Sequence, residues 1–260
     1  MLLEDKNAII YGGGGSIGTA TALTFAREGA RVFLVGRTQE TLDAAAQQVR
    51  DAGGQADTAV IDVLDGPAVD EHAKAVAAEH GSLDVSFLLV ARGDVQQIPL
   101  VDMTLADLER PVVNGIRSTF NTATSAARIM SEQGSGVILG LNSGSATASM
   151  PGMGGTGPAD AAQETFLRYL AAECGPKGVR VLNIYTAGVQ ETFTQAKLDD
   201  VAEGSWDPEK AIEMISGMSV LGRAPRLAEV TETATFLASD RASGMTGVSV
   251  NVTSGLILGR

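Results

Sequence analysis

The sequence has few of the residues that form covalent cross-links or metal centres. Its 260 residues include one cysteine, Cys174, and two histidines, His72 and His80. A single cysteine excludes an intramolecular disulfide and fits a reducing compartment, so we expect a cytoplasmic protein. Both histidines lie in a polar stretch with helical spacing, where we expect them at the surface. No metal site is therefore predicted.

Long apolar runs and positive charge are also scarce. No run reaches eighteen apolar residues, so no membrane-spanning helix is expected. The opening "MLLEDKNAIIYGG" lacks the features of a signal peptide and is typical of a first strand. Lysine and arginine total 19 against 31 acidic residues, a net charge of −12. Such a surface repels phosphate backbones, so nucleic acid is not an expected partner. A dinucleotide can still bind, because local backbone dipoles hold its pyrophosphate.

Short β-branched runs alternate with longer segments of helical periodicity. The runs predicted as strands are 7–11, 30–35, 57–61, 84–90, 136–141, 179–185 and 248–252. Segments such as 16–30, 38–54 and 66–81 have apolar residues at helical spacing and predict helices. This alternation predicts a doubly wound (Rossmann) α/β fold, a seven-stranded parallel sheet in a single domain over 1–260. The least regular stretch, about 188–224, contains the only tryptophan, Trp206, and is expected to form a lid over a ligand site.

A glycine-rich loop follows the first predicted strand and opens the first helix. In "AIIYGGGGSIGTA" the candidate cofactor-binding residues are Gly12, Gly15, Ser16, Ile17 and Gly18. Glycine permits a tight turn and lets backbone N–H groups approach a pyrophosphate at the helix N-terminus. An ordinary strand–helix turn is the alternative, but four consecutive glycines exceed what a turn requires. The loop therefore indicates nucleotide binding.

The next two strand ends carry candidate groups for the adenosine half of the cofactor. The second strand ends in "VFLVGRT", where Arg37 offers a fork of donors suited to a 2′-phosphate. This favours NADP over NAD, although a solvated loop arginine is the alternative. Asp62, at the end of the third strand, is placed to accept from an adenine amino group. Alternatively, Asp62 caps the helix that follows.

Taken together, these motifs resemble the short-chain dehydrogenase/reductase family over essentially the whole chain. The glycine loop is similar to that family's TGxxxGIG, and Asp62-Val63 matches its DV pair. Asn114 falls at the family's helix asparagine and Ser143 at its catalytic serine. The stretch 229–252 is similar to the family's C-terminal signature. The segment "GVRVLNIYTAGVQET" resembles the family's RVNxVxPG followed by Thr. In this segment Thr186 stands for the proline, and Gly188 and Thr192 take the places of the later glycine and threonine.

The departures from the family pattern cluster around its chemistry. The family's NNAG motif reads Val90 to Gly93, with Arg92 in place of a small residue. Counting from Ser143 places Thr156 at the catalytic tyrosine position and Asp160 at the lysine position. In a divergent branch resembling enoyl-carrier-protein reductases, the lysine position is Gln163. The resemblance therefore implies an atypical member that lacks the Tyr-Lys pair.

In this family the tyrosine delivers a proton while a neighbouring lysine lowers its pKa. A threonine hydroxyl at 156 is far too weak an acid for that role, but it can donate a hydrogen bond to a carbonyl. Tyr185, at the end of the sixth strand, is the candidate replacement donor, with a position inside the core as the alternative. Arg92 and Asp160 are expected in the same pocket, where an ion pair would restore positive charge beside the ribose. The usual exposure of charged side chains favours the alternative, that each points into solvent.

Two functions follow from this resemblance. The first is an NADP(H)-dependent oxidoreductase that acts on a small-molecule carbonyl or alcohol with a degenerate active site. The second is a catalytically inactive dinucleotide-binding or scaffold protein that kept the fold. A lyase or isomerase is a third class, which no residue selects. The resemblance also implies a homodimer or homotetramer that pairs through the helices beginning near Leu105 and Gly157.

Overall fold

Seven parallel strands form the centre of the molecule, as the alternating pattern predicts. The computed structural model describes residues 1–201 and 207–258, so the predicted lid tryptophan, Trp206, lies outside the described residues. The strand order is β3-β2-β1-β4-β5-β6-β7, all pairs parallel. The strands are β1 (Asn7–Tyr11), β2 (Arg31–Gly36), β3 (Gln55–Val60), β4 (Val85–Leu88), β5 (Gly136–Asn142), β6 (Val179–Tyr185) and β7 (Ser249–Asn251).

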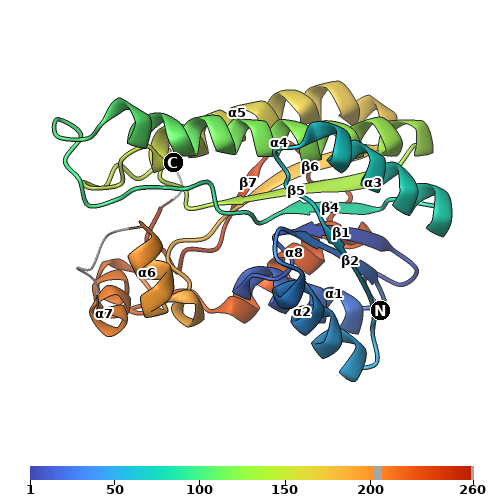
Figure 1. The fold of residues 1–260 in the computed structure, drawn as a ribbon, viewed down its shortest axis with the longest axis horizontal. Coiled ribbons are helices and arrows are strands. Elements are labelled where there is room, and N and C mark those ends of the chain that lie inside the picture. The colour runs from blue at the N-terminus through green and yellow to red at the C-terminus, as the bar shows by residue number, and fades with distance from the viewer. Residues whose placement is uncertain (202–206, 259–260) are drawn as a thin grey trace.

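Helices cover both faces of the sheet because each presents an apolar stripe to it. One face carries α3 (Gly66–His80), α4 (Leu105–Gln133) and α5 (Thr156–Cys174), and the other carries α1 (Ser16–Arg27), α2 (Gln39–Asp51) and α8 (Leu227–Ala238) (Figure 1). Two buried apolar clusters fill the two interfaces. The doubly wound fold predicted from the sequence is confirmed.

Local signals set the ends of these helices. The side chain of Asp65 accepts a hydrogen bond from the N–H of Ala68 at the start of α3, and Thr104 does the same for Asp107 at the start of α4. Gly81 and Gly134 end α3 and α4 in the left-handed conformation. Asp62 is therefore not the cap of α3, and the capping alternative for that residue is wrong.

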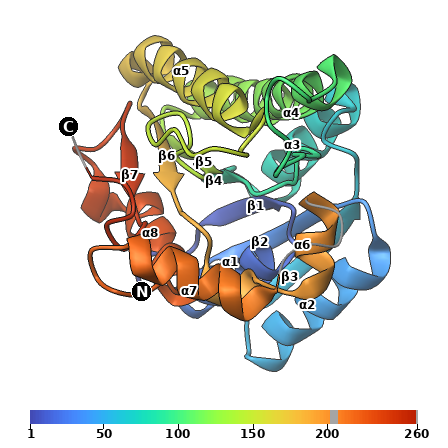
Figure 2. The ribbon, with the colours of Figure 1, turned by 90° about the vertical axis from the view of Figure 1, so that its left-hand side faces the viewer.

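The stretch after β6 forms short helices at the carboxyl end of the sheet. These are η2 (Gln190–Thr192), α6 (Gln195–Val201) and α7 (Pro208–Met218), and Figure 2 shows α6 and α7 standing in front of the strand ends. The two remaining short helices are η1 (Gly175–Lys177) and η3 (Asp240–Ala242). The predicted lid region is thus more regular than its composition indicates, since Asp207 caps α7 through the N–H groups of Glu209 and Lys210.

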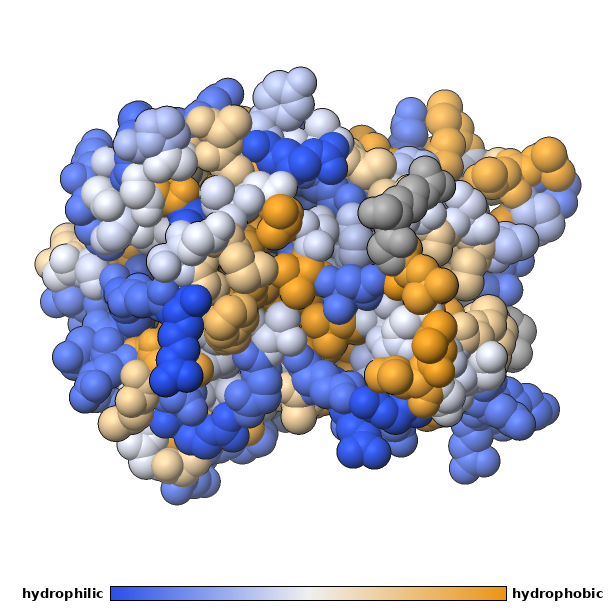
Figure 3. Space-filling view, turned by 180° about the vertical axis from the view of Figure 1, so that it is seen from behind, coloured by the Kyte–Doolittle hydropathy of each residue, from blue (hydrophilic) through white to orange (hydrophobic). Residues whose placement is uncertain are grey.

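Apolar side chains also reach the surface near this end. Among the exposed ones are Met214, Met218, Val220, Leu221 and Leu258. Seen from behind, hydrophilic residues predominate at the edge away from α6 and α7, and apolar residues gather across the middle and on the side where α6 and α7 lie (Figure 3). In the described part of the chain, no helix combines the length and apolarity needed to span a bilayer.

Candidate active site

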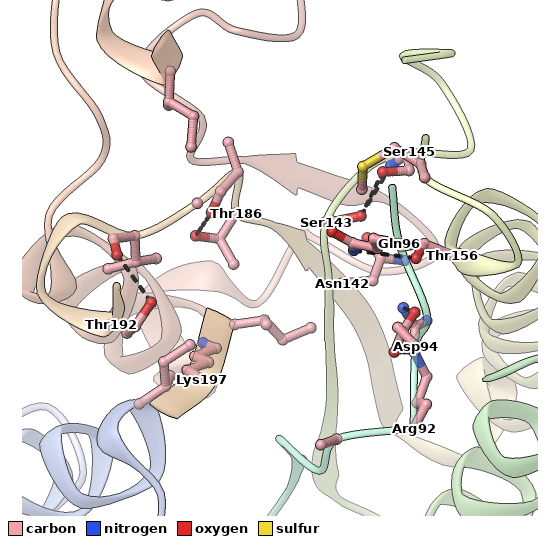
Figure 4. Close-up of a pocket in the computed structure, with 18 of the residues that line it drawn as sticks. Arg92, Asp94, Gln96, Asn142, Ser143, Ser145, Thr156, Thr186, Thr192 and Lys197 are labelled. Carbon is pink, nitrogen blue, oxygen red and sulfur yellow. Dashed lines mark hydrogen bonds and ion pairs between the residues drawn. The ribbon is translucent and has the colours of Figure 1, made fainter. Parts of the chain in front are cut away.

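A cavity of about 640 Å³ lies where the carboxyl ends of β4, β5 and β6 meet the α6–α7 segment. The strand order reverses between β1 and β4, and such a switch point is where doubly wound sheets bind ligands. Figure 4 shows its polar residues in two groups on opposite sides: Arg92, Asp94, Gln96, Ser143, Ser145 and Thr156 on one, and Thr186, Thr192 and Lys197 on the other. The cavity is therefore bounded by the sheet on one side and by the predicted lid on the other.

The glycine loop has the shape of a phosphate cradle. Gly12 has φ +85°, and a Cβ there would lie 2.7 Å from the carbonyl oxygen of Leu89. A Cβ on Gly18 would collide with the carbonyl of Gly12, so both positions require glycine. Gly15 caps α1 without any side-chain hydrogen bond, which leaves the first N–H groups of the helix, from Ser16 on, open to an anion. Ile17 lines the cavity. The residues present thus fit a dinucleotide.

The two residues predicted for the adenosine half, Arg37 and Asp62, and Val63 of the DV pair lie outside the cavity wall. Arg37 is exposed just after β2, and its guanidinium has no ion pair or hydrogen bond with the described side chains of residues 1–199 and 207–258. Asp62 is exposed, and its carboxylate accepts from the N–H of Leu64 at 2.9 Å. Val63 is buried in the core, and its carbonyl accepts from the amide of Asn121. Arg37 and Asp62 therefore remain free to meet a ligand from solvent.

Arg92 and Asp160 form the ion pair that the sequence placed in this pocket. Arg92 Nη1 lies 2.7 Å from Asp160 Oδ1, and the Asp160 side chain is 0% exposed. The alternative that both point into solvent is wrong, because Asp160 projects from α5 into the space beneath the end of β5, where it meets donors instead of water. Removing an unpaired carboxylate from water is costly, so the arginine is required there.

A second carboxylate completes the surroundings of Arg92. Asp94 Oδ1 lies 3.0 Å from Arg92 Nη2, and Asp94 Oδ2 accepts from Nε at 3.3 Å. Burial alone would lower the pKa of Arg92, but the carboxylates of Asp94 and Asp160 outweigh that effect and raise the pKa above its usual value. Arg92 is therefore a permanent cation, and it faces two negative charges.

The catalytic-position serine is fully engaged in the same cluster. Ser143 donates to Asp160 Oδ2 at 2.7 Å, its oxygen lies 2.7 Å from the hydroxyl of Ser145, and the N–H of Ser145 reaches it at 3.3 Å. The Ser145 N–H also donates to Asp160 at 3.0 Å. A hydroxyl has one proton and two lone pairs. In this arrangement Ser143 has no proton left for a substrate carbonyl.

Thr156 is the hydroxyl that stays available. It begins α5, is 2% exposed and lines the cavity. Its Oγ1 accepts from the Gln96 amide at 3.4 Å, and among the described residues its proton has no acceptor. Gln163, the alternative lysine position, also lines the cavity and its amide donates to the carbonyl of Leu141.

Other predicted residues support the walls of the cavity. Asn114 does not line it; its amide donates to the carbonyl of Arg92 at 3.0 Å and holds that segment against α4. Gly188 and Thr192 line the lid side, and Thr192 donates to the carbonyl of Val189. A Cβ on Gly188 would collide with the ring of Phe193.

Tyr185 does not line this cavity. Its hydroxyl donates to Glu164 at 2.7 Å, and it borders a second cavity of about 400 Å³ beside β7. Burial raises its pKa, and the hydrogen bond to Glu164 adds to that effect. Side chains alternate along a strand, so Tyr185 lies on the opposite side from Thr186, which lines the main cavity. A role for Tyr185 as replacement proton donor is therefore not supported by its position.

Sequence reasoning missed several residues of the site. Asp94, Gln96 and Ser145 complete the polar wall, and Lys197 faces it from α6. The opposite charge two residues after Arg92 was a usable signal for Asp94, and Ser145 follows Ser143 at the same spacing. Nothing in the irregular segment distinguished Lys197 from other surface lysines.

Comparison with known families agrees with this architecture. Residues 13–257 match the family model described as Enoyl-(Acyl carrier protein) reductase. The chain is 30% identical over 258 residues to the 3-oxoacyl-acyl-carrier-protein reductase FabG of Thermotoga maritima, covering 99% of this chain and 100% of that one. The chain belongs to the short-chain dehydrogenase/reductase family of oxidoreductases.

Two further relatives show how widely the family's substrates vary. A 3alpha-hydroxysteroid dehydrogenase from Mediterraneibacter gnavus is 30% identical, with 97% of each chain covered. The solved structure of NAD+-bound xylitol dehydrogenase superposes with a TM-score of 0.87 at 25% identity, covering 98% of this chain and all of that chain. The names of the relatives therefore do not identify the substrate of this chain.

The buried ion pair generates a stability prediction. Asp160→Ala leaves Arg92 without its most buried partner and is expected to lower the free energy of unfolding by about 3–5 kcal/mol. Replacing both partners, as Arg92→Met with Asp160→Leu, removes both charges together and is expected to be less destabilising. Urea denaturation followed by circular dichroism measures both values.

Arg27→Ala is the matched control, because the Arg27–Glu232 pair lies exposed on the surface. Its expected cost is below about 1 kcal/mol. Equal losses for Asp160→Ala and Arg27→Ala would show that the buried pair has no special structural role.

Proposed function

We propose that this chain is an NADP(H)-dependent oxidoreductase of a carbonyl or alcohol substrate whose active site lacks the family's tyrosine–lysine pair. The observation that carries the proposal is the cluster at the lysine position, where Asp160 is buried and bound to Arg92, Ser143 and Ser145. In the family, a lysine cation at this position would act on the cofactor and on the catalytic acid. Here a closed network of hydrogen bonds around Asp160 stands in its place. The cavity and the glycine loop beside it remain open for ligands.

In this proposal the glycine loop, Arg37 and Asp62 hold the dinucleotide, whose nicotinamide supplies or accepts the hydride. The Thr156 hydroxyl donates a hydrogen bond to the substrate oxygen, since its proton has no other acceptor in the described residues. Threonine does not release that proton at neutral pH, so the proton that completes the alcohol comes from solvent. Loss of a positioned acid removes about 10² to 10⁴ in rate, so slow turnover is expected.

The engaged state of Ser143 favours a second candidate, a dinucleotide-binding protein without turnover. The two candidates share cofactor binding and differ in chemistry. Titration with NADPH followed by its oxidation against a panel of ketones and aldehydes separates them. Cofactor binding without oxidation of any panel member would favour the second candidate, and failure to bind would refute both.

Cofactor choice is a first test. If Arg37 meets a 2′-phosphate, NADPH binds at least about tenfold more tightly than NADH. Arg37→Asp is expected to reverse that order, because a carboxylate repels the phosphate and accepts from a ribose hydroxyl. Arg241→Asp, at an exposed arginine of η3, is the control and should change neither affinity. Equal affinities for NADPH and NADH in the parent protein would contradict the assignment to NADP.

Restoring the missing pair is a second test, and the ion pair dictates its design. Asp160→Lys alone would place an ammonium group against the Arg92 guanidinium, and like charges repel. The variant that restores the family pattern therefore combines Arg92→Ala, Thr156→Tyr and Asp160→Lys. We expect carbonyl reduction to rise about 10²-fold or more, measured as the rate of NADPH oxidation.

Thr156→Tyr alone serves as the comparison, because it adds the acid without the cation and should gain much less. A triple variant that binds NADPH yet stays inert on the panel would show that the pocket has lost more than its acid. The reductase assignment of the parent chain would then be dropped.

Assembly is a third test. We expect a closed symmetric homo-oligomer that pairs through α4 and α5, where Val113, Phe120 and Tyr169 are exposed. Phe120→Glu should shift the protein to monomers in light scattering at micromolar concentration. Val60→Glu, at an exposed apolar position on β3, should leave the oligomer intact. A monomeric parent protein would rule the assembly out.

A further inference from the structure

The cavity has a methionine-rich lining. Four of the eight methionines in the chain, Met150, Met153, Met214 and Met218, line it. Unbranched thioether side chains adapt to ligands of different shape. A cavity of this size also fits one small-molecule ligand. The lining therefore favours a flexible apolar body over a compact polar one.

Charge in the cavity is divided between its two sides. The charged residues among its described lining are Arg92, Asp94 and Lys197. On the sheet side, Arg92 is matched by Asp94 and by the buried Asp160, so that wall holds two negative charges and one positive. On the lid side, Lys197 has no acidic partner among the described side chains, those of residues 1–199 and 207–258. Among the described residues that line the cavity, Lys197 is therefore the cation without a compensating carboxylate.

Lys197 lies on α6, across the cavity from Arg92 and Asp94 (Figure 4). Its side chain is exposed, yet the protein around its ammonium group desolvates the charge and lowers its pKa. An anion at this point would restore the lost solvation of the charge. The sheet-side wall, with two carboxylates and one guanidinium, would repel the same anion, so a bound ligand would place its anionic group on the lid side.

We propose that the substrate of this cavity is an elongated apolar acid whose carboxylate pairs with Lys197 and whose apolar body lies against the four methionines. This rests on the proposed function, because the reacting carbonyl or alcohol at the other end would lie beside Thr156. The substrate would then carry its acid and its reacting oxygen at separate positions. Lys197 determines specificity, and it takes no part in proton transfer.

A cofactor phosphate is the other anion that Lys197 could meet, and the experiment separates the two sources. Decanoate, 1-decanol and NADPH are each titrated by calorimetry into the full-length protein, with the first two also measured in the presence of NADP+. The variants are Lys197→Met, Lys197→Arg and the control Lys177→Met, at an exposed lysine of η1 outside the cavity lining.

We expect decanoate to bind the parent protein more tightly than 1-decanol. Lys197→Met should weaken decanoate at least about tenfold, while 1-decanol and NADPH change less than twofold. Lys197→Arg should retain decanoate binding, and Lys177→Met should change none of the three. An unchanged decanoate affinity in Lys197→Met would overturn the proposal.

A tenfold loss of NADPH affinity in Lys197→Met, with decanoate unaffected, would also overturn it, because the lysine would then serve the cofactor. Failure of the proposed function has a different signature. In that case the parent protein would not bind NADPH, whereas decanoate binding and its dependence on Lys197 would persist.

Discussion

The burial of one carboxylate determines how the rest of the site is organised. Asp160 lies on α5, directly beneath the end of β5, with its side chain fully withdrawn from solvent. A charge in that position requires donors, and the chain supplies them from three places: the guanidinium of Arg92 after β4, the hydroxyl of Ser143, and the backbone N–H of Ser145. The interaction therefore ties α5 to two neighbouring strand ends.

The same arrangement limits the chemistry that remains. Ser143 uses its proton on Asp160, and Arg92 directs donors toward Asp94 and Asp160. The side chains at the family's serine and lysine positions, Ser143 and Asp160, are thus turned toward one another. Among the described polar groups that line the cavity, the hydroxyl of Thr156 on the sheet side and the ammonium of Lys197 on the lid side are available to a ligand.

The strands, the helices and the glycine loop can be predicted from the sequence because their signals are local. A buried parallel strand is a short β-branched run, and the glycine loop between β1 and α1 is contiguous, so both are legible without knowledge of distant contacts. Pairing of Arg92 with Asp160 spans 68 residues, and only the family register brought them together as candidates. The usual exposure of charged side chains instead predicted that Arg92 and Asp160 point into solvent. Such general statistics cannot identify one particular buried ion pair.

Tyr185 and Lys197 mark the limit of that reasoning. A shift of one residue in the register of β6 would turn Tyr185 toward the other side of the sheet and so change the cavity that it borders. That register is set by pairing with β7, which is distant in the sequence. Lys197 lies in a short helix whose position over the sheet is fixed by tertiary packing rather than by its own periodicity. Both outcomes depend on contacts between segments far apart in the chain.

The cluster of Arg92, Asp94 and Asp160 pairs its own charges, and this changes how much a bound ligand can stabilise the protein. In a site with an isolated lysine or an unpaired carboxylate, a bound cofactor or substrate would neutralise a buried charge and stabilise the fold. Here Arg92 pairs with both carboxylates without any ligand. Under the proposed function, recognition is left to groups outside the cluster: the open N-terminus of α1, Arg37 on the surface, Thr156, and Lys197 on the lid side. Evolution of this cavity toward a new ligand can then proceed on the lid side without disturbing the interaction that holds α5 to the sheet.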